Sequence, residues 1–158
     1  MNIIFTRPLI DAEDLMTNFF SSNYKVIHLP TLSITSANME PINTKEFDGL
    51  IFTSANAVRF LQLKNDEKNI KCFCVGNITE RSLRLKGFTN TVAASGTVNA
   101  LKNIILNSEK KIKNLAYLCG DVVSYDLDKD LKLSGFKVKK IINYTSSKIT
   151  NLSSESLD

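Results

Sequence analysis

Four apolar runs in this chain of 158 residues end in small polar residues. The ends are FTSAN (52–56), CVGNIT (74–79), AASGT (93–97) and LCGDV (118–122). Gly, Ser, Thr and Asn let backbone N–H groups approach a ligand closely, and the start of a helix adds the positive end of its dipole. These ends therefore suit carboxylates or phosphates. Each end taken alone is better explained as a helix cap or a turn, whereas the four together leave the two interpretations evenly balanced.

Other residues with chemical potential fall outside recognised catalytic patterns. No G-x-G-x-x-G motif, Walker lysine loop or G-x-S-x-G motif is present, so dinucleotide, nucleoside triphosphate and serine hydrolase sites are not indicated. Asp48 precedes its apolar run and Asp121 stands alone, which disfavours a receiver-type phosphorylation site. His28 is the sole histidine, and a packed or edge role is expected. Cys72 and Cys74 would share one strand face as buried, reduced thiols, and two ligands do not complete a zinc site, so we expect no metal there.

An alternation of short apolar runs with amphipathic stretches predicts the elements that position these ends. The expected strands span residues 2–6, 24–30, 48–53, 70–76, 90–94, 114–120 and 136–144. The expected helices span residues 11–22, 54–64, 77–87, 97–110 and 125–135. Ser54 is expected to cap the second helix, and Gly87 is well suited to follow the third. Residues 31–47 are interpreted as a polar connection.

The order of these elements predicts the fold class. Five strands alternating with four helices between residues 48 and 144 indicate an α/β domain with a parallel sheet covered on both faces. Right-handed crossovers then favour a flavodoxin-like, doubly wound, five-stranded sheet over residues 36–144, with ligands at the carboxyl ends of its strands. Residues 1–35 form a strand–helix–strand fragment that is too small to bury a core of its own. The Ser-rich segment 145–158 is expected to be a mobile tail or linker.

Composition sets the broad class. A hydrophobic content of 43% and a charged content of 23% are those of a soluble globular protein. The net charge of +4 fits an anionic small ligand, and the basic residues form no cluster that would favour nucleic acid. No segment has the apolar length of a membrane span. The N-terminal MNIIFTRPL lacks a basic leader and a cleavage site, so a cytoplasmic location is expected.

Several stretches resemble the uroporphyrinogen-III synthase family, and they follow the family's order at similar spacing. The stretches are FTRP (5–8), YKVIHLPTLSI (24–34), DGLIFTSANAVRFL (48–61), CVGNITERSLRLKGF (74–88) and LKLSGFKVKKIINY (131–144). FTSANAV is the most specific of these motifs, and TRP alone would be weak. The resemblance covers residues 3–144, which is nearly all of the chain that is predicted to be ordered.

The resemblance implies a two-domain enzyme with a deep cleft and no cofactor. Members of the family take linear hydroxymethylbilane, remove water, invert the last pyrrole ring and close the macrocycle. The substrate carries eight carboxylates, which the family binds largely through backbone amides and hydroxyls. Holding a flexible polyanion in a folded shape is catalysis mainly by positioning. The polar strand ends agree with this chemistry.

The family's site residues transfer by position onto this sequence. One wall of the cleft would be lined by Thr53, Ser54, Ala55 and Asn56, and the next loop by Gly76 and Thr79. Arg7 could approach substrate carboxylates, although an ion pair with a nearby acidic residue explains it equally well. Tyr144 matches a tyrosine that follows the last strand of this domain and faces the cleft. Tyr144 is the candidate proton donor to the departing hydroxyl, and an aromatic anchor for the linker is an equal alternative.

The chain also departs from the family pattern. The family's first domain is discontinuous, and its sheet is completed by a segment that returns after the second domain. That segment is expected to be missing here, so residues 1–35 would be part of an incomplete domain that a second copy or a complementing chain could cover. Two hypotheses remain from the sequence. The chain is a shortened synthase, or it is a non-catalytic remnant or binding module that keeps one wall of the cleft.

Overall fold

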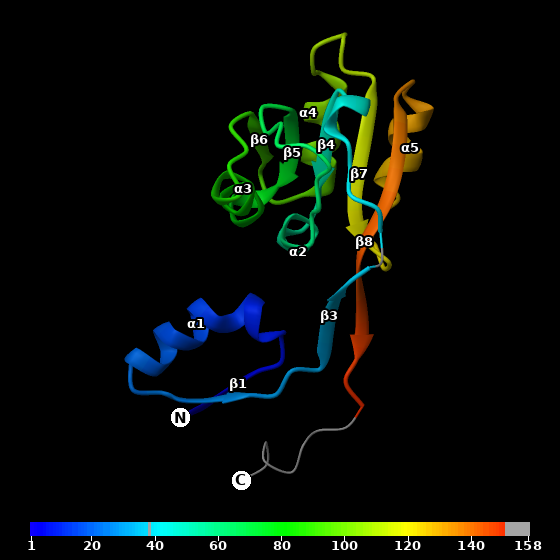
Figure 1. The fold of residues 1–158 in the computed structure, drawn as a ribbon. Coiled ribbons are helices and arrows are strands. Elements are labelled where there is room, and N and C mark those ends of the chain that lie inside the picture. The colour runs from blue at the N-terminus through cyan, green and yellow to red at the C-terminus, as the bar shows by residue number, and fades with distance from the viewer. Residues whose placement is uncertain (38, 151–158) are drawn as a thin grey trace. The chain divides into compact units, whose positions relative to one another are not determined.

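The computed structural model describes residues 1–37 and 39–150. The chain divides into two compact units (Figure 1). The larger unit is Ser36–Thr145, and the smaller unit comprises Met1–Thr35 with the described residues from Ser146 onward.

The smaller unit begins with a strand–helix–strand segment, as predicted. Its elements are β1 (Asn2–Phe5), α1 (Leu9–Ser21) and β2 (Lys25–His28). β1 and β2 pair in parallel, from Asn2 opposite Lys25 to Phe5 opposite His28. Phe19 of α1 lies with its ring centroid 5.9 Å from that of Phe5. Asn23, with a φ of 62°, makes the sharp reversal between helix and second strand.

A six-stranded sheet contains every strand from Leu32 onward, and its strands from Gly49 onward form the centre of the larger unit. All of its first strand except Ser36 belongs to the smaller unit. In chain order the strands are β3 (Leu32–Ser36), β4 (Gly49–Phe52), β5 (Lys71–Val75), β6 (Thr91–Ala94), β7 (Asn114–Gly120) and β8 (Lys137–Lys148). Their spatial order is β3-β8-β7-β4-β5-β6. The five strands from β4 to β8 pair in parallel, which confirms the predicted parallel sheet.

The strand order corrects the predicted flavodoxin-like detail. Numbered along the chain from β4, the five parallel strands lie in the order 3-2-1-4-5, whereas flavodoxin has 2-1-3-4-5. The chain leaves β4 toward β5 and β6, then crosses back to place β7 on the other side of β4. The topological switch point therefore lies between β4 and β7. Hydrophobic periodicity predicts the number and type of elements, but it does not specify which strand becomes whose neighbour.

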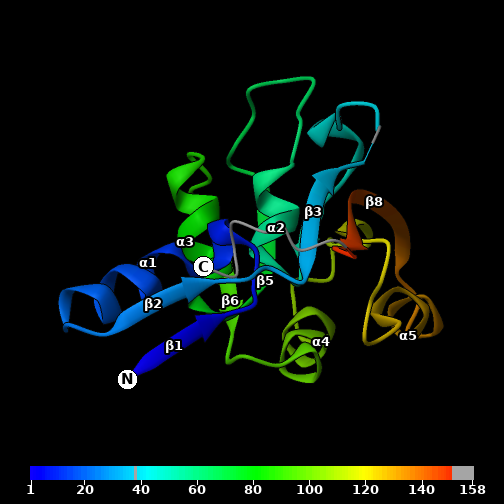
Figure 2. The ribbon, with the colours of Figure 1, turned by 90° about the horizontal axis from the view of Figure 1, so that it is seen from below.

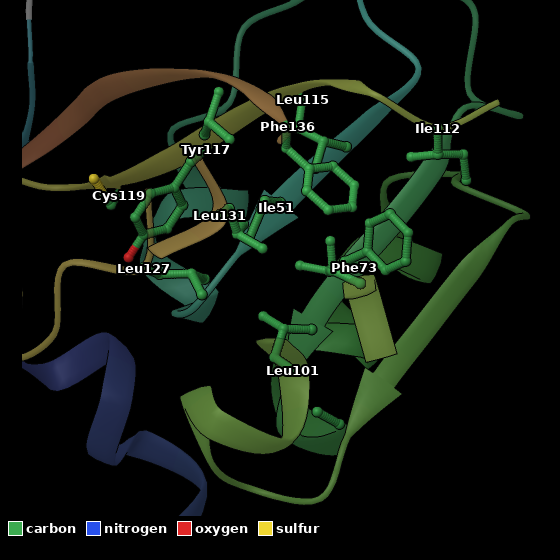
Figure 3. Close-up of a cluster of buried hydrophobic side chains, with 13 residues drawn as sticks. Ile51, Phe73, Leu101, Ile112, Leu115, Tyr117, Cys119, Leu127, Leu131 and Phe136 are labelled. Carbon is green, nitrogen blue, oxygen red and sulfur yellow. The ribbon is translucent and has the colours of Figure 1, made fainter. Parts of the chain in front are cut away.

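Helices cover both faces of this sheet, as expected. α2 (Ala55–Arg59) and α3 (Gly76–Leu85) pack on one face, and α4 (Val98–Leu106) and α5 (Leu127–Leu133) on the other. Side chains of β4 alternate between the two: Leu50 faces the first pair of helices, while Ile51 faces the second. Figure 3 shows the second cluster, in which Ile51, Phe73 and Leu101 lie near one another. α4 and α5 lie on the same side of the strands in Figure 2 as well.

Two segments that were predicted to be irregular contain β-strand. The expected connection 31–47 contains β3 and a short 3-10 helix at Thr44–Glu46. The expected mobile tail 145–158 is strand as far as Lys148, and Ser147 Oγ lies 2.8 Å from Ser33 Oγ of β3. Both strands are polar and largely exposed here, so they lack the apolar alternation by which strands are recognised. Residues 151–158 lie outside the described part of the chain.

The ends of the helices confirm the predicted caps. Ser54 caps α2, and Gly87 has a φ of +94° directly after α3. The N–H of Gly87 donates to the carbonyl of Arg84 and that of Phe88 to the carbonyl of Leu83, which is a Schellman motif. The predicted helix 54–64 is shorter than expected, since α2 ends at Arg59. Lys86 Nζ donates to the carbonyl of Arg59, 3.1 Å away, and so binds the end of α2.

Candidate functional site

The carboxyl ends of β4 and β7 lie side by side at the switch point. Phe52 of β4 pairs with Leu118 of β7, and after these residues the chain turns to opposite faces of the sheet. Open parallel sheets bind their ligands at such a point. We call this region the switch-point edge, and define it by Thr53, Ser54, Gly120, Asp121 and Tyr144.

Ser54 links β4 to α2. Its backbone is extended, with φ −150° and ψ 144°, and its Oγ accepts a hydrogen bond of 3.1 Å from the N–H of Asn56. The hydroxyl proton of Ser54 is left for another acceptor. Ser54 and Ala55 are both half-buried. The structure thus places the cap at the edge where the sequence predicted a ligand.

Thr53 is coupled to a buried tyrosine that the sequence reasoning did not select. Thr53 Oγ1 lies 3.1 Å from the hydroxyl oxygen of Tyr117, whose side chain is 2% exposed. Burial raises the pKa of Tyr117 to about 12, so the phenol is neutral over the physiological range. Figure 3 shows the Tyr117 hydroxyl among apolar side chains. A tyrosine within the otherwise apolar run LAYLC (115–119) was the available signal, because a buried hydroxyl requires a partner.

Tyr144 lies over the end of β7. It is opposite Gly120 in the register, and the N–H of Asp121 donates to its carbonyl at 3.2 Å. A Cβ added at Gly120 would come within 2.7 Å of the Tyr144 ring. The ring also stacks on Phe60, with a centroid separation of 6.4 Å. Gly120 lies within the strand end LCGDV that the sequence indicated, but neither Gly120 nor Phe60 was selected as a site residue.

Two other predicted residues on this unit are buried. Asn56 is 7% exposed, and its side-chain oxygen accepts a hydrogen bond from the guanidinium of Arg59. Thr79 lies in α3 and is 5% exposed. Gly76 is half-buried at the junction of β5 and α3, where a φ of +76° turns the strand directly into the helix. Of these three residues, Gly76 is the most exposed to solvent.

Arg7 belongs to the smaller unit. It lies between β1 and α1 with an exposed side chain, and its carbonyl accepts a hydrogen bond of 2.9 Å from His28 Nε2. The imidazole therefore carries its proton on Nε2. This contact supports the structural role expected for His28, and a role of Arg7 toward a ligand stays a prediction.

The described cysteines are buried thiols, as expected. Cys72, Cys74 and Cys119 are free, and burial raises their pKa values to about 12, 11 and 11. They are therefore protonated at neutral pH and poor nucleophiles. Within residues 1–37 and 39–150, no group of three or more His, Cys, Asp or Glu side chains could hold a metal ion. In the same residues, no helix has the length and apolar character of a membrane span.

A scan against protein families decides the relationship of this chain. The model described as "Uroporphyrinogen-III synthase HemD" matches residues 14–157. The chain belongs to the uroporphyrinogen-III synthase family. The resemblance carried by FTSANAV and its neighbouring motifs is thereby confirmed.

Solved structures of uroporphyrinogen-III synthases share the fold. The enzyme from Helicobacter pylori 26695 aligns with a TM-score of 0.64 at 22% identity, over 99% of this chain and 66% of that one. A mutant enzyme from the extremely thermophilic bacterium Thermus thermophilus aligns with a TM-score of 0.60 at 15% identity, over 94% of this chain and 64% of that one. This chain thus spans just under two thirds of the length of both. No curated protein matches it.

Proposed function

We propose that the switch-point edge binds hydroxymethylbilane and takes part in its cyclisation, with loss of water and inversion of the last pyrrole ring. The family match over residues 14–157 carries this proposal. It assigns the chain to tetrapyrrole biosynthesis, and we propose that the reaction takes place in the cytoplasm. No cofactor enters the proposed steps.

Hydroxyls and backbone N–H groups bind the substrate carboxylates. Thr53 Oγ1 lies 3.1 Å from the neutral hydroxyl of Tyr117. We propose that Tyr117 donates in this contact, which leaves the proton of the Thr53 hydroxyl for a carboxylate. The Ser54 hydroxyl is available in the same way, since its oxygen accepts from the N–H of Asn56. The net charge of +4 favours the approach of a polyanion. Ala55, Asn56, Gly76 and Thr79 complete the proposed wall, and Arg7 is proposed as a further carboxylate ligand.

Tyr144 supplies the proton for the departing hydroxyl. The lone pair of the pyrrole nitrogen expels the hydroxyl as the carbon–oxygen bond breaks, and the Tyr144 proton converts the leaving group to water. The carbon of the last ring that already carries a methylene bridge then attacks the hydroxymethyl carbon. The bond from that ring carbon to its methylene bridge breaks and re-forms at the other α carbon of the ring, which inverts the ring and closes the macrocycle. Loss of a proton from the product restores the proton of Tyr144. The enzyme contributes one donor and a folded substrate, so positioning provides most of the acceleration.

The smaller unit is proposed to be part of a discontinuous first domain. Its apolar side chains are extensively exposed, including Phe20 at 73% and Ile4 at 56%. A second copy of the chain or a complementing chain would bury them. Analytical ultracentrifugation over a concentration series checks this, and a strict monomer would contradict it.

The synthase assay is the decisive experiment. Hydroxymethylbilane is supplied to the full chain, and the III isomer is separated from the spontaneously formed I isomer. We expect net formation of the III isomer, and a fall in kcat of about 10²–10⁴-fold for Tyr144→Phe, as is typical of a lost general acid. Tyr24→Phe, in the smaller unit, is the matched control and should retain the native rate.

Failure of this assay has a defined meaning. Native protein that yields only the I isomer is not a synthase by itself. Calorimetric titration with the substrate then separates a binding module, which retains affinity that depends on Thr53, from a chain without a site.

A further inference from the structure

Strand β8 contains a bulge next to the end of β7. Cys119 pairs with Ile142, but the next residue, Gly120, pairs with Tyr144, so Asn143 is the extra residue. With regular alternation Tyr144 would share a face with Ile142, which is 44% exposed. The bulge turns Tyr144 instead to the face that carries α2, where it packs with Ile141 against the same buried cluster.

Asn143 holds this bulge in place. Its side chain is fully buried, and Nδ2 donates a hydrogen bond of 2.7 Å to the carbonyl of Ala57 in α2. The carbonyl of Asn143 accepts from the N–H of Ala37 at 3.1 Å. The next carbonyl, that of Tyr144, accepts from the N–H of Asp121. The Asn143 side chain and the backbone carbonyls of Asn143 and Tyr144 are therefore bonded to three different segments of the larger unit.

Gly120 provides the space into which the ring turns. The position of a Cβ at residue 120 lies 2.7 Å from Cε2, 2.8 Å from Cζ and 3.0 Å from the hydroxyl oxygen of Tyr144. All three distances are below or at the limit that carbon atoms tolerate. The Tyr144 hydroxyl thus sits against the backbone at the carboxyl end of β7, and only a residue without a side chain permits it there.

We propose that Asn143 and Gly120 are positioning residues that direct the Tyr144 hydroxyl to the switch-point edge. Asn143 anchors the bulge that selects the face, and Gly120 leaves room for the ring. The catalytic consequence rests on the proposed synthase function, whereas the placement of the ring does not. The two parts are therefore tested by separate measurements.

The placement is tested by NMR of protein labelled with ¹³C in its four tyrosines. The spectrum of Tyr144→Phe assigns the Tyr144 signals. In Gly120→Ala and in the isosteric Asn143→Asp, which loses the donor to Ala57, the Tyr144 ring signals should shift while those of Tyr24 and Tyr125 remain. Gly49→Ala is the matched control, because a Cβ there is also crowded, at 3.0 Å from Leu115, but at the opposite end of the sheet. It should leave the Tyr144 signals in place.

The catalytic part is tested with hydroxymethylbilane as substrate. We expect kcat of Gly120→Ala to fall about tenfold to a hundredfold with KM within about twofold, the pattern of a displaced catalytic group. In the Tyr144→Phe background the same substitution should cause little further loss. Equal losses in both backgrounds would overturn the role toward the hydroxyl.

The remaining outcomes also decide the proposal. Unmoved Tyr144 signals in both variants overturn the placement. If Gly120→Ala fails to fold but folds when Tyr144 is shortened to Ala, the clash is with Tyr144 and the proposal is supported; failure in both backgrounds overturns the part of Gly120. Shifted signals in a native chain without synthase activity reject the proposed function and leave the placement standing.

Discussion

The two units share a local pattern of strands and helices but differ in how many residues they bury. Each begins with a strand, a helix and a parallel strand, yet Ala12 is the sole buried residue among those described in the smaller unit. The larger unit has buried clusters on both faces of its sheet. A helix on one face of two strands cannot exclude water, whereas four helices on two faces can. The core comes from coverage on both faces, not from the pattern of any one element.

This difference also explains where the candidate site lies. The switch-point edge depends on β4 and β7 being neighbours, and both are buried strands of the larger unit. Thr53 obtains its partner from the core itself, since Tyr117 reaches it from within the buried cluster. The following four predictions test whether stability and site belong to the larger unit.

The largest effect is expected from a matched pair of leucines. Leu101 in α4 is fully buried, and Leu15 in α1 is 52% exposed. Leu101→Ala should lower the free energy of unfolding by about 3–5 kcal/mol, because it leaves a cavity, whereas Leu15→Ala should cost less than about 1 kcal/mol. Urea denaturation followed by circular dichroism measures both. Similar losses would break the comparison between the units.

A smaller effect is expected from Tyr117 at alkaline pH. Burial raises its folded pKa to about 12 from an ordinary value of 10, so its contribution is complete below pH 10 and is lost as the pH rises toward 12. Tyr117→Phe cannot ionise, and should remove about 1–1.5 kcal/mol of the decline in stability between pH 8 and pH 11. Denaturation at pH 8 and at pH 11 checks this. Tyr24→Phe is the control, and an equal change there would contradict the prediction.

The cap of α2 should contribute about 1 kcal/mol. Ser54→Ala removes the acceptor for the N–H of Asn56, which is the usual cost of a lost N-cap. The matched change is Ser22→Ala at the exposed end of α1, where the hydroxyl donates to the carbonyl of Asn18. It should have a smaller effect on the urea midpoint. A larger effect for Ser22→Ala would reverse the comparison.

The smallest effect concerns Asp48, just before β4. Hydrogen bonds from the backbone N–H groups of Asn114 and Lys113 hold the pKa of its carboxyl below the usual range. Its contribution is therefore present above the unfolded pKa and lost as the pH falls through the folded one. Asp48→Asn should cost about 1 kcal/mol or less at pH 7, since the group is exposed, and the cost should shrink at acid pH. Thermal melts at pH 7 and pH 3 measure this, with Asp14→Asn in α1 as the control of equal charge.

Much of the larger unit was predictable because its signals are local. Ser54 and Gly87 indicate helix ends by residue type, and β4 is apolar along its whole length. The strand β3 was missed for the opposite reason, since a polar edge strand looks like a loop. Thr53 and Ser54 were selected from their place after a strand. Tyr117 was not selected, and Gly120 was indicated only as part of the strand end LCGDV, because their roles depend on partners distant in the sequence, Thr53 and Tyr144.

The amino-acid sequence by itself determined the alternation of strands and helices, the parallel sheet, the helix caps and the polar residues at the strand ends. These follow from periodicity and from the preferences of single residues, which act over a few positions. Only the tertiary structure decided the strand order, the bulge at Asn143 and the placement of Tyr144 over Gly120. Each of these depends on which distant segments become neighbours. That choice is made by the packing of the whole sheet and not by any local pattern.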